Sequence, residues 1–235
     1  MIEASVLFAL ALAYAGASTM WPRRMLFDYF SGNVLWSGDG RANRVALTFD
    51  DGPDPRYTPP ILDILKRHRS KATFFLMGEN VALHPDLSRR IVEEGHLVGN
   101  HTYSHPRLIF LNRRRMEEEI DRAENLIAEA TGVRPVYFRP PYGLRDFRVL
   151  DIVQKKGYTC AMWTTMSWDW WRPDVERIIS ASLKKLKAGG ILLLHDGNGD
   201  RWQTVQALER IVIGLKERGL ELVTLSELTQ DEGLG

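Results

Sequence analysis

The sequence predicts an α/β protein folded as a distorted (β/α) barrel of about seven strands. Between residues 44 and 225, short apolar runs alternate with amphipathic stretches. Continuous apolar runs of this length are typical of parallel strands that are covered on both faces. A length of 235 residues also suits a single barrel domain. An open doubly wound sheet is the alternative, although no glycine-rich phosphate-binding turn follows the first strand.

The expected strands are short and lie at regular intervals along the chain. We place them at Val45–Phe49, Ala72–Met77, Leu97–Gly99, Val136–Phe138, Thr159–Thr164, Ile191–Leu194 and Glu221–Thr224. Cys160 is the only cysteine, so a disulfide within the chain and a cysteine-based metal site are both excluded. We expect Cys160 to be a small buried residue.

The expected helices are punctuated by capping residues. Thr58 can cap a helix that has Pro59 at its first position. The longest helix runs from Asn112 to Thr131 and ends at Gly132, because its apolar residues recur at alternating spacings of four and three. Further helices begin at Pro85 and Asp174, and at a capping-box-like pair formed by Asp200 and Gln203.

The chain divides into four segments. We expect residues 1–22 to form a hydrophobic segment, 23–43 a connector, 44–229 the folded α/β domain and 230–235 a tail. From Ala4 to Pro22 there is no charge, and about 19 residues just span a bilayer core. A membrane anchor, a cleaved signal with a site near Ala15-Gly16-Ala17, and a soluble core helix all remain open. We expect a membrane-anchored or secreted protein of the cell envelope.

The overall charge is balanced. The formal net charge is +1, which gives no indication of a nucleic-acid partner. We expect the protein to be a monomer.

Ionisable side chains follow five of the expected strands. Catalytic groups of barrel enzymes lie at the carboxyl ends of the strands, which meet at one rim. The sequences at these positions are Asp50-Asp51-Gly52-Pro53, His101 to His105, Arg139-Pro140-Pro141-Tyr142-Gly143, Trp168-Asp169-Trp170 and His195-Asp196-Gly197.

Asp50 and Asp51 form an adjacent carboxylate pair, in which repulsion between like charges raises the pKa of one group. A fold tolerates this cost where a cation or a reaction needs the pair. Asp-Asp-Gly-Pro is also good turn chemistry, so a simple turn is the alternative. His101 and His105 are four residues apart and would share one face of a helical turn. With a carboxylate from Asp50 or Asp51 they would complete a ligand set known from catalytic zinc sites. A capping or surface histidine pair is the alternative.

His195 is a candidate general acid, because its ordinary pKa lies near neutrality. A buried core histidine is the alternative.

Arg139 could pair with Asp50 and keep that carboxylate ionised. Aromatic residues that could stack on sugar rings cluster near the same strand ends, although we expect Trp163 to be a core residue: Tyr142, Trp163, Trp168, Trp170 and Trp171.

Taken in order, these motifs resemble those of the polysaccharide deacetylases, the carbohydrate esterases that share the NodB homology domain. The resemblance covers about Val45 to Leu225. Five motifs carry it: Thr48–Pro53 (TFDDGP), His101–His105 (HTYSH), Arg139–Gly143 (RPPYG), Asp169-Trp170, and Leu193-Leu194-His195. One departure is the tryptophan-rich fourth motif, where the family often has small or polar residues.

The resemblance implies a NodB-like distorted barrel and metal-dependent removal of acetyl groups from the N-acetylated sugars of a chitin- or peptidoglycan-type polysaccharide. It implies that Asp51, His101 and His105 hold a divalent metal. Zn²⁺ is the usual ion, with Co²⁺ or Ni²⁺ as alternatives. A non-catalytic carbohydrate-binding relative and a hydrolase of a non-sugar C–N amide bond are competing interpretations.

The resemblance also implies roles for the remaining site residues. Asp50 would be the general base, oriented by Arg139. His195 would be the general acid, tuned by Asp169. The oxyanion and the substrate would be bound by Tyr142, through its backbone N–H, together with Pro141, Trp168 and Trp170.

Overall fold

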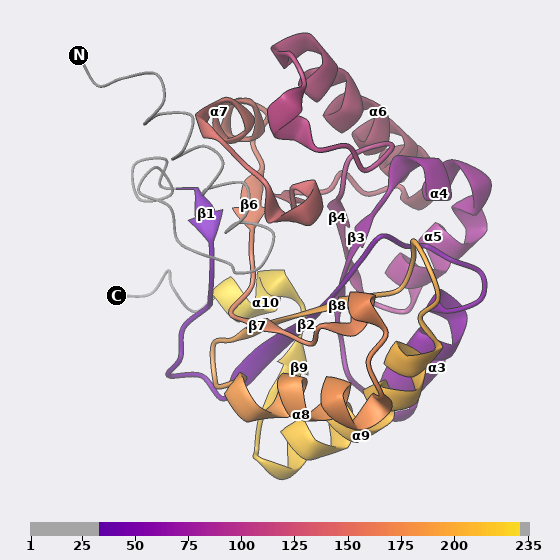
Figure 1. The fold of residues 1–235 in the computed structure, drawn as a ribbon, viewed down its shortest axis with the longest axis vertical. Helices are drawn as coiled ribbons and strands as arrows, with labels where there is room; N and C mark the ends of the chain where they lie inside the picture. The colour runs from indigo at the N-terminus through magenta and orange to yellow at the C-terminus, as the bar shows by residue number, and fades with distance from the viewer. Residues whose placement is uncertain (1–32, 231–235) are drawn as a thin grey trace.

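The computed structural model describes residues 33–230 and shows a parallel sheet curled into an incomplete barrel, with helices around it (Figure 1). This confirms the predicted fold class. The predicted hydrophobic segment, residues 1–22, lies outside the described residues, as does most of the tail. None of the helices within 33–230 is long and apolar enough to cross a membrane.

The sheet contains nine strands over the described range, and every registered pair is parallel. Their order is β1-β6-β5-β4-β3-β2-β8-β7, with β9 paired to β2. All carboxyl ends therefore meet at one rim. The strands are β1 Val34–Leu35, β2 Arg44–Asp50, β3 Thr73–Leu76, β4 Leu97–Asn100, β5 Tyr137–Phe138, β6 Thr159–Ala161, β7 Thr165–Met166, β8 Ile191–His195 and β9 Glu221–Val223.

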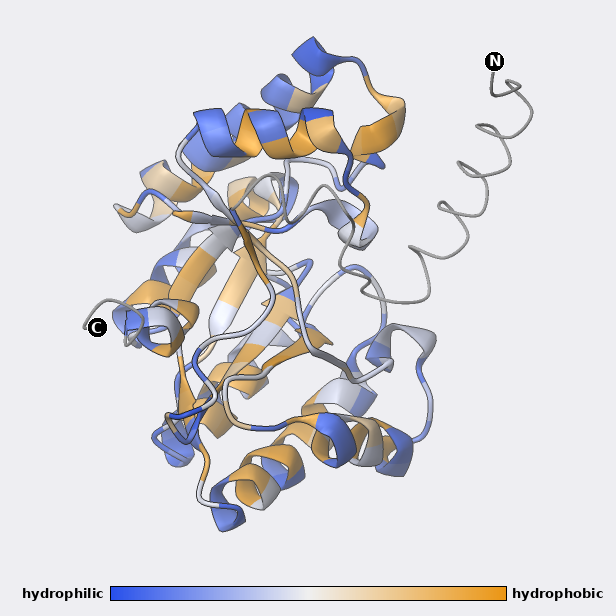
Figure 2. Ribbon diagram, turned by 90° about the vertical axis from the view of Figure 1, so that its left-hand side faces the viewer, coloured by the Kyte–Doolittle hydropathy of each residue, from blue (hydrophilic) through white to orange (hydrophobic). Residues whose placement is uncertain are grey.

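The helices surround the sheet, and Figure 2 shows mixed polar and apolar residues along them, as expected for helices with one buried face. The α-helices are α3 Thr58–Arg67, α4 Gly78–Leu83, α5 Pro85–Glu93, α6 Arg113–Thr131, α7 Phe147–Lys155, α8 Val175–Lys185, α9 Trp202–Glu217 and α10 Leu225–Thr229. Three short 3₁₀ turns complete the described part: η1 Leu108–Phe110, η2 Pro141–Gly143 and η3 Asp169–Trp171.

Strand β2 divides the core into two layers. Successive side chains of a strand point to opposite faces. Val45, Leu47 and Phe49 belong to the outer core, which includes residues of α3 and α9, whereas Ala46 belongs to a second core with Phe75 of β3. The same alternation directs Thr48 and Asp50 toward the barrel interior, where they meet Arg139. The alternation of side chains along β2 therefore places the Asp50 carboxylate at the inner rim of the barrel.

The strands differ from those expected at two places. The predicted connector contains β1, which pairs with β6. The run Thr159–Thr164 is not one strand, because the chain leaves β6 after Ala161 and forms β7 at Thr165. β6 pairs with β5, whereas β7 pairs with β8 on the other side of the barrel. Met162 and Trp163, which cross between the two strands, are buried and apolar, so the sequence pattern does not reveal the break.

Two predicted helix caps were also wrong, because the Thr58 side chain bonds to a distant residue and Asp200 precedes the cap position, which Arg201 holds. Tyr57 holds the cap position of α3, and the Thr58 hydroxyl instead donates to Asp196 Oδ2 at 2.6 Å. Asp200 accepts from Trp202 N at 3.1 Å, and α9 begins at Trp202 without a capping box. Local signals were right at three other termini: Asn112 caps α6, Gly132 ends it with φ 73°, and Asp174 caps α8.

Candidate active site

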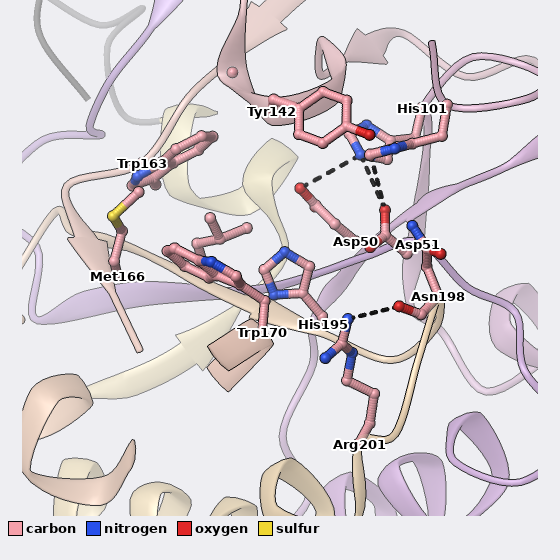
Figure 3. Close-up of a pocket in the computed structure, with 13 residues that line it drawn as sticks. Asp50, Asp51, His101, Tyr142, Trp163, Met166, Trp170, His195, Asn198 and Arg201 are labelled. Atoms are coloured by element: carbon pink, nitrogen blue, oxygen red, sulfur yellow. Dashed lines mark hydrogen bonds and ion pairs between the residues drawn. The ribbon is translucent and has the colours of Figure 1, made fainter. Parts of the chain in front are cut away.

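A cavity of about 270 Å³ opens at the carboxyl-terminal rim of the strands (Figure 3). It collects side chains from five predicted motifs, far apart in sequence, as parallel strands require. Its lining comprises Asp50, Asp51, His101, His105, Tyr142, Gly143, Trp163, Met166, Trp170, Leu193, His195, Asn198 and Arg201.

Asp50 is held from behind by a fully buried arginine. Arg139 Nη1 donates to Asp50 Oδ1 at 2.8 Å and to Thr48 Oγ1 at 2.7 Å. Its other nitrogens donate to the carbonyls of Ala161 and Met162 at 3.0 and 2.9 Å. The guanidinium is therefore satisfied, which a buried cation requires. Asp50 keeps its second oxygen toward the cavity, 3.8 Å from His101 Nε2.

Asp51, His101 and His105 converge on one point. Asp51 Oδ1 lies 3.4 Å from His101 Nε2 and 3.2 Å from His105 Nε2. The predicted helical turn between the two histidines was wrong, because residues 101–105 form a loop in which Thr102 and His105 have φ of 68° and 59°. This loop brings the rings to 5.0 Å between centroids. The convergence was predicted correctly, but the backbone that produces it was not.

The donor set of these three residues fits a divalent cation. His101 Nδ1 lies 2.7 Å from the Arg139 carbonyl, which can only accept, so Nδ1 carries the proton and Nε2 presents its lone pair. Burial is the main cause that lowers the pKa of His105 to about 4, so this ring is neutral at pH 7. Asp51 Oδ1 is buried and accepts no hydrogen bond. Three atoms with lone pairs therefore face one another with no proton between them. A bound metal ion stabilises such an arrangement.

Asp51 is also charged. Burial opposes its charge, but the close contact with His101 and the positive charge of His195 lower the pKa of Asp51 well below its ordinary value. Two glycines allow the loop that contains Asp51 to approach the loop after β8 closely. A Cβ on Gly197 would lie 2.1 Å from the Asp51 carbonyl, and one on Gly52 would lie 2.3 Å from Asp196 Oδ2. Only glycine allows this approach.

His195 and Asp169 form a buried pair opposite the carboxylates. Asp169 Oδ1 accepts from His195 Nδ1 at 2.8 Å, and Oδ2 accepts from the His195 backbone N–H at 2.8 Å. Ser167 and Thr204 donate to the same carboxylate. Burial favours the neutral ring, but the charge and hydrogen bond of Asp169, with Asp51 and Asp50, raise the pKa of His195 to about 9. His195 is therefore cationic at neutral pH.

The predicted substrate-binding residues divide between two places. Tyr142, with φ 60°, lies 4.6 Å from His105 between ring centroids, and Trp170 lies 5.7 Å from His195. Both line the cavity, whereas Pro141 is buried and does not line it. Trp168 lines a separate groove. Trp163 is a core residue, as predicted, and its ring also reaches the cavity wall.

The sequence profile described as polysaccharide deacetylase matches residues 37–161. A peptidoglycan-N-acetylglucosamine deacetylase of Bacillus cereus is 39% identical over 203 residues, which cover 84% of this chain and 93% of that protein. The chain belongs to the polysaccharide deacetylase family.

Further matches support this membership. A chitooligosaccharide deacetylase of a Bradyrhizobium species is 41% identical over 204 residues, covering 81% of this chain and 93% of that protein. A solved structure of a peptidoglycan N-acetylglucosamine deacetylase in complex with 4-naphthalen-1-yl-N-oxidanyl-benzamide has a TM-score of 0.84 at 37% identity, covering 87% of this chain and 96% of the other. The predicted family, its barrel fold and its enzyme class are thereby confirmed.

Sequence reasoning missed several residues around the cavity. Asn198 and Arg201 line it beside His195, and Arg201 is anchored on the Gly197 and Asn198 carbonyls at 2.8 and 2.9 Å. The turn-forming Gly-Asn-Gly-Asp sequence that follows the fifth motif was the signal available for them.

Asp196 was also missed as a buried carboxyl group. Burial raises its pKa to about 7, and nothing in the sequence distinguishes it from a turn residue.

Proposed function

We propose that the protein hydrolyses the N-acetyl groups of a glycan of the chitin or peptidoglycan type. One observation carries the proposal: three unprotonated ligand atoms converge beside a carboxylate that arginine holds, across the cavity from a protonated histidine. The substrates named for the relatives support the choice of an N-acetylated sugar.

Asp51, His101 and His105 would hold the metal ion. Two imidazole nitrogens and one carboxylate oxygen are typical of catalytic zinc, so we propose Zn²⁺, with Co²⁺ or Ni²⁺ as ions of similar ligand preference. When bound, such an ion polarises a carbonyl group and lowers the pKa of water. The described residues supply three ligands, which leaves coordination positions for substrate and water.

Asp50 would act as the general base. Its Oδ1 is held by Arg139, so Oδ2 is the oxygen that can accept the proton of the attacking water. The buried positive charge of Arg139 favours the ionised carboxylate that a base requires. Attack on the acetyl carbon creates an oxyanion, for which we propose the Tyr142 backbone N–H as a donor.

His195 would act as the general acid. Its Nδ1 is bound to Asp169, so the proton on the other ring nitrogen is available to the cavity. Transfer of this proton to the amide nitrogen allows the C–N bond to break, with acetate and a free amine as products. The proton taken from water by Asp50 and the proton given by His195 balance the reaction, and exchange with solvent restores both groups.

The experiment is acetate release from chitooligosaccharides and from peptidoglycan, with and without a chelator. We expect release that the chelator abolishes and that Zn²⁺ restores. A non-catalytic relative would bind glycan without releasing acetate, and a hydrolase of other amides would leave both polymers intact.

Two matched variants separate the roles of the adjacent carboxylates. Asp50→Asn should lose acetate release and keep a full equivalent of metal, because Asp50 is not among the three converging ligands. Asp51→Asn should lose the metal itself. Retained activity in Asp51→Asn together with metal loss in Asp50→Asn would reverse the assignment.

We further propose a location at the cell envelope as a monomer. The uncharged run from Ala4 to Pro22 supports export or anchoring. Fractionation of cells that express the full chain, beside a version that lacks residues 1–22, tests the location, and light scattering of the purified protein tests the monomer.

A further inference from the structure

A second cavity, of about 490 Å³, lies between the edge strand β7 and helix α8. We call it the β7–α8 groove. None of the residues assigned to the reaction above lines it, but Met166 lines both this groove and the active-site cavity. The two hollows are therefore neighbours. The groove is lined by Met166, Ser167, Trp168, Trp171, Pro173, Arg177, Ser180, Ala181, Lys184 and Lys185.

A row of indole rings connects the active site to this groove. Trp170 lies 5.7 Å from His195, and Trp168 lies 5.0 Å from Trp170 and 5.7 Å from Trp171 between ring centroids. Trp171 is 67% exposed, although a large aromatic ring gains most from burial. An exposed indole beside a concave surface is suited to stacking against the apolar face of a bound ring.

The charge of the groove has one sign. Its lining includes Arg177, Lys184 and Lys185 and no acidic residue. Arg177 contacts Asp174 at 3.4 Å, but both side chains are mostly exposed, so this pair is weak and exchangeable. Arg177 and Lys184 are seven residues apart on α8, which puts them on one face about 10 Å apart along the axis. The lining is therefore complementary to a ligand with negative groups.

We propose that the β7–α8 groove binds the portion of the glycan beside the sugar that is deacetylated, and that it recognises carboxylate groups on that portion. The inference rests on the proposed function and narrows its substrate to an acidic glycan, such as a peptidoglycan strand with free carboxylates. A neutral chitin chain would stack on the indoles but would gain nothing from the positive charges of the groove. Connection to the active site and charge complementarity favour a glycan strand as the occupant.

The experiment compares two versions of one substrate. Peptidoglycan fragments with free carboxylates are tested beside the same fragments after conversion of those carboxylates to amides, with chitooligosaccharides of equal length as a neutral reference. Two exposed cation–carboxylate contacts should lower KM for the free-acid fragments by roughly two- to tenfold, with little change in kcat. Calorimetric binding of the same fragments gives a readout that does not depend on turnover.

Variants on α8 locate the effect. The double variant Arg177→Gln/Lys184→Gln should raise KM for the free-acid fragments to that of the amidated ones. Its kcat and KM on chitooligosaccharides should stay at wild-type values. Trp171→Ala should weaken binding of all fragments. Lys187→Gln is the matched control, because Lys187 is exposed and close in sequence but is not part of the groove lining.

The outcomes separate this inference from the proposed function. Equal KM and equal affinity for free-acid and amidated fragments would overturn the groove proposal while leaving deacetylation intact. A preference for free acids that survives in the double variant would also overturn it, since the recognition would lie elsewhere. Absence of acetate release from every substrate would instead contradict the proposed function, and calorimetry would still report on the groove.

Discussion

Asp169→Asn tests the electrostatic basis of the general acid. Asp169 is the nearest anion to His195, with 2.8 Å hydrogen bonds to both its ring and its backbone. Burial of the ring acts in the opposite direction, and the pKa of His195 still rises to about 9. Against an ordinary value near 6.5, this shift corresponds to about 3 kcal/mol in favour of the protonated ring.

Removal of the Asp169 charge should lower the pKa of His195 toward its ordinary value near 6.5, because burial is then opposed only by Asp51 and Asp50. At pH 8 a ring with a pKa near 9 is about 90% protonated, whereas one near 6.5 is about 3% protonated. We therefore expect kcat/KM to fall roughly 20-fold more at pH 8 than at pH 6. A pH-independent loss should accompany it, since an amide group cannot replace both acceptor oxygens of Asp169.

The assay is acetate release across pH 5 to 10 with metal held constant. A bound cation would lower the pKa of His195 in both proteins. The quantity to compare is therefore the difference between the two proteins in the pH at which kcat/KM falls on the alkaline side of the profile. Ser167→Ala is the control, because it removes one donor to Asp169 Oδ1 but keeps the charge. Identical alkaline limbs in wild type and Asp169→Asn would refute the electrostatic account of His195.

Three further changes follow from the same contacts. His195→Ala should lose about 10²- to 10⁴-fold in kcat while circular dichroism shows an intact fold, and wild-type rates would remove it from the reaction. Gly52→Ala should lower the stability by about 1–3 kcal/mol in denaturant unfolding, because its Cβ would lie 2.3 Å from Asp196 Oδ2; an unchanged midpoint would mean that the loops separate easily. Asp196→Asn tests a buried acid whose folded pKa, about 7, is raised above its ordinary 3.8, chiefly by burial. Ionisation of Asp196 should therefore destabilise the wild type as the pH rises from about 4 to 7. Over this window the melting temperature of metal-free Asp196→Asn should rise relative to that of the metal-free wild type, and above pH 7 the difference between them should stay constant. A difference that is already constant from pH 4 to 7 would show that Asp196 is ionised throughout.

The sequence alone determined the family, the barrel and most of the ionisable residues that gather at its rim. Apolar runs that end in ionisable residues identify both the strands and their rim, because parallel strands leave all their carboxyl ends on one side. The caps of α6 and α8 were also readable, since Asn112, Gly132 and Asp174 act on backbone groups within a few residues. These are local signals, and the chain carries them whatever else it contacts.

Only the tertiary structure decided which partners each group has. Thr58 carries a cap signal, but Asp196, which is 138 residues away, takes its hydroxyl. The tautomer of His101 depends on the carbonyl of Arg139, and the free oxygen of Asp50 depends on the side chain of Arg139. Such partners come from other strands, so no local pattern records them.

The tryptophans of the fourth motif show the same limit most directly. Trp168 and Trp170 are equivalent in the sequence, yet one lines the β7–α8 groove and the other the active-site cavity. Left-handed backbone at Trp168 and Arg172, with φ of 63° and 53°, starts and ends the turn that separates them. Non-glycine residues adopt this conformation only where surrounding contacts compensate its cost, and those contacts exist only once the barrel has formed.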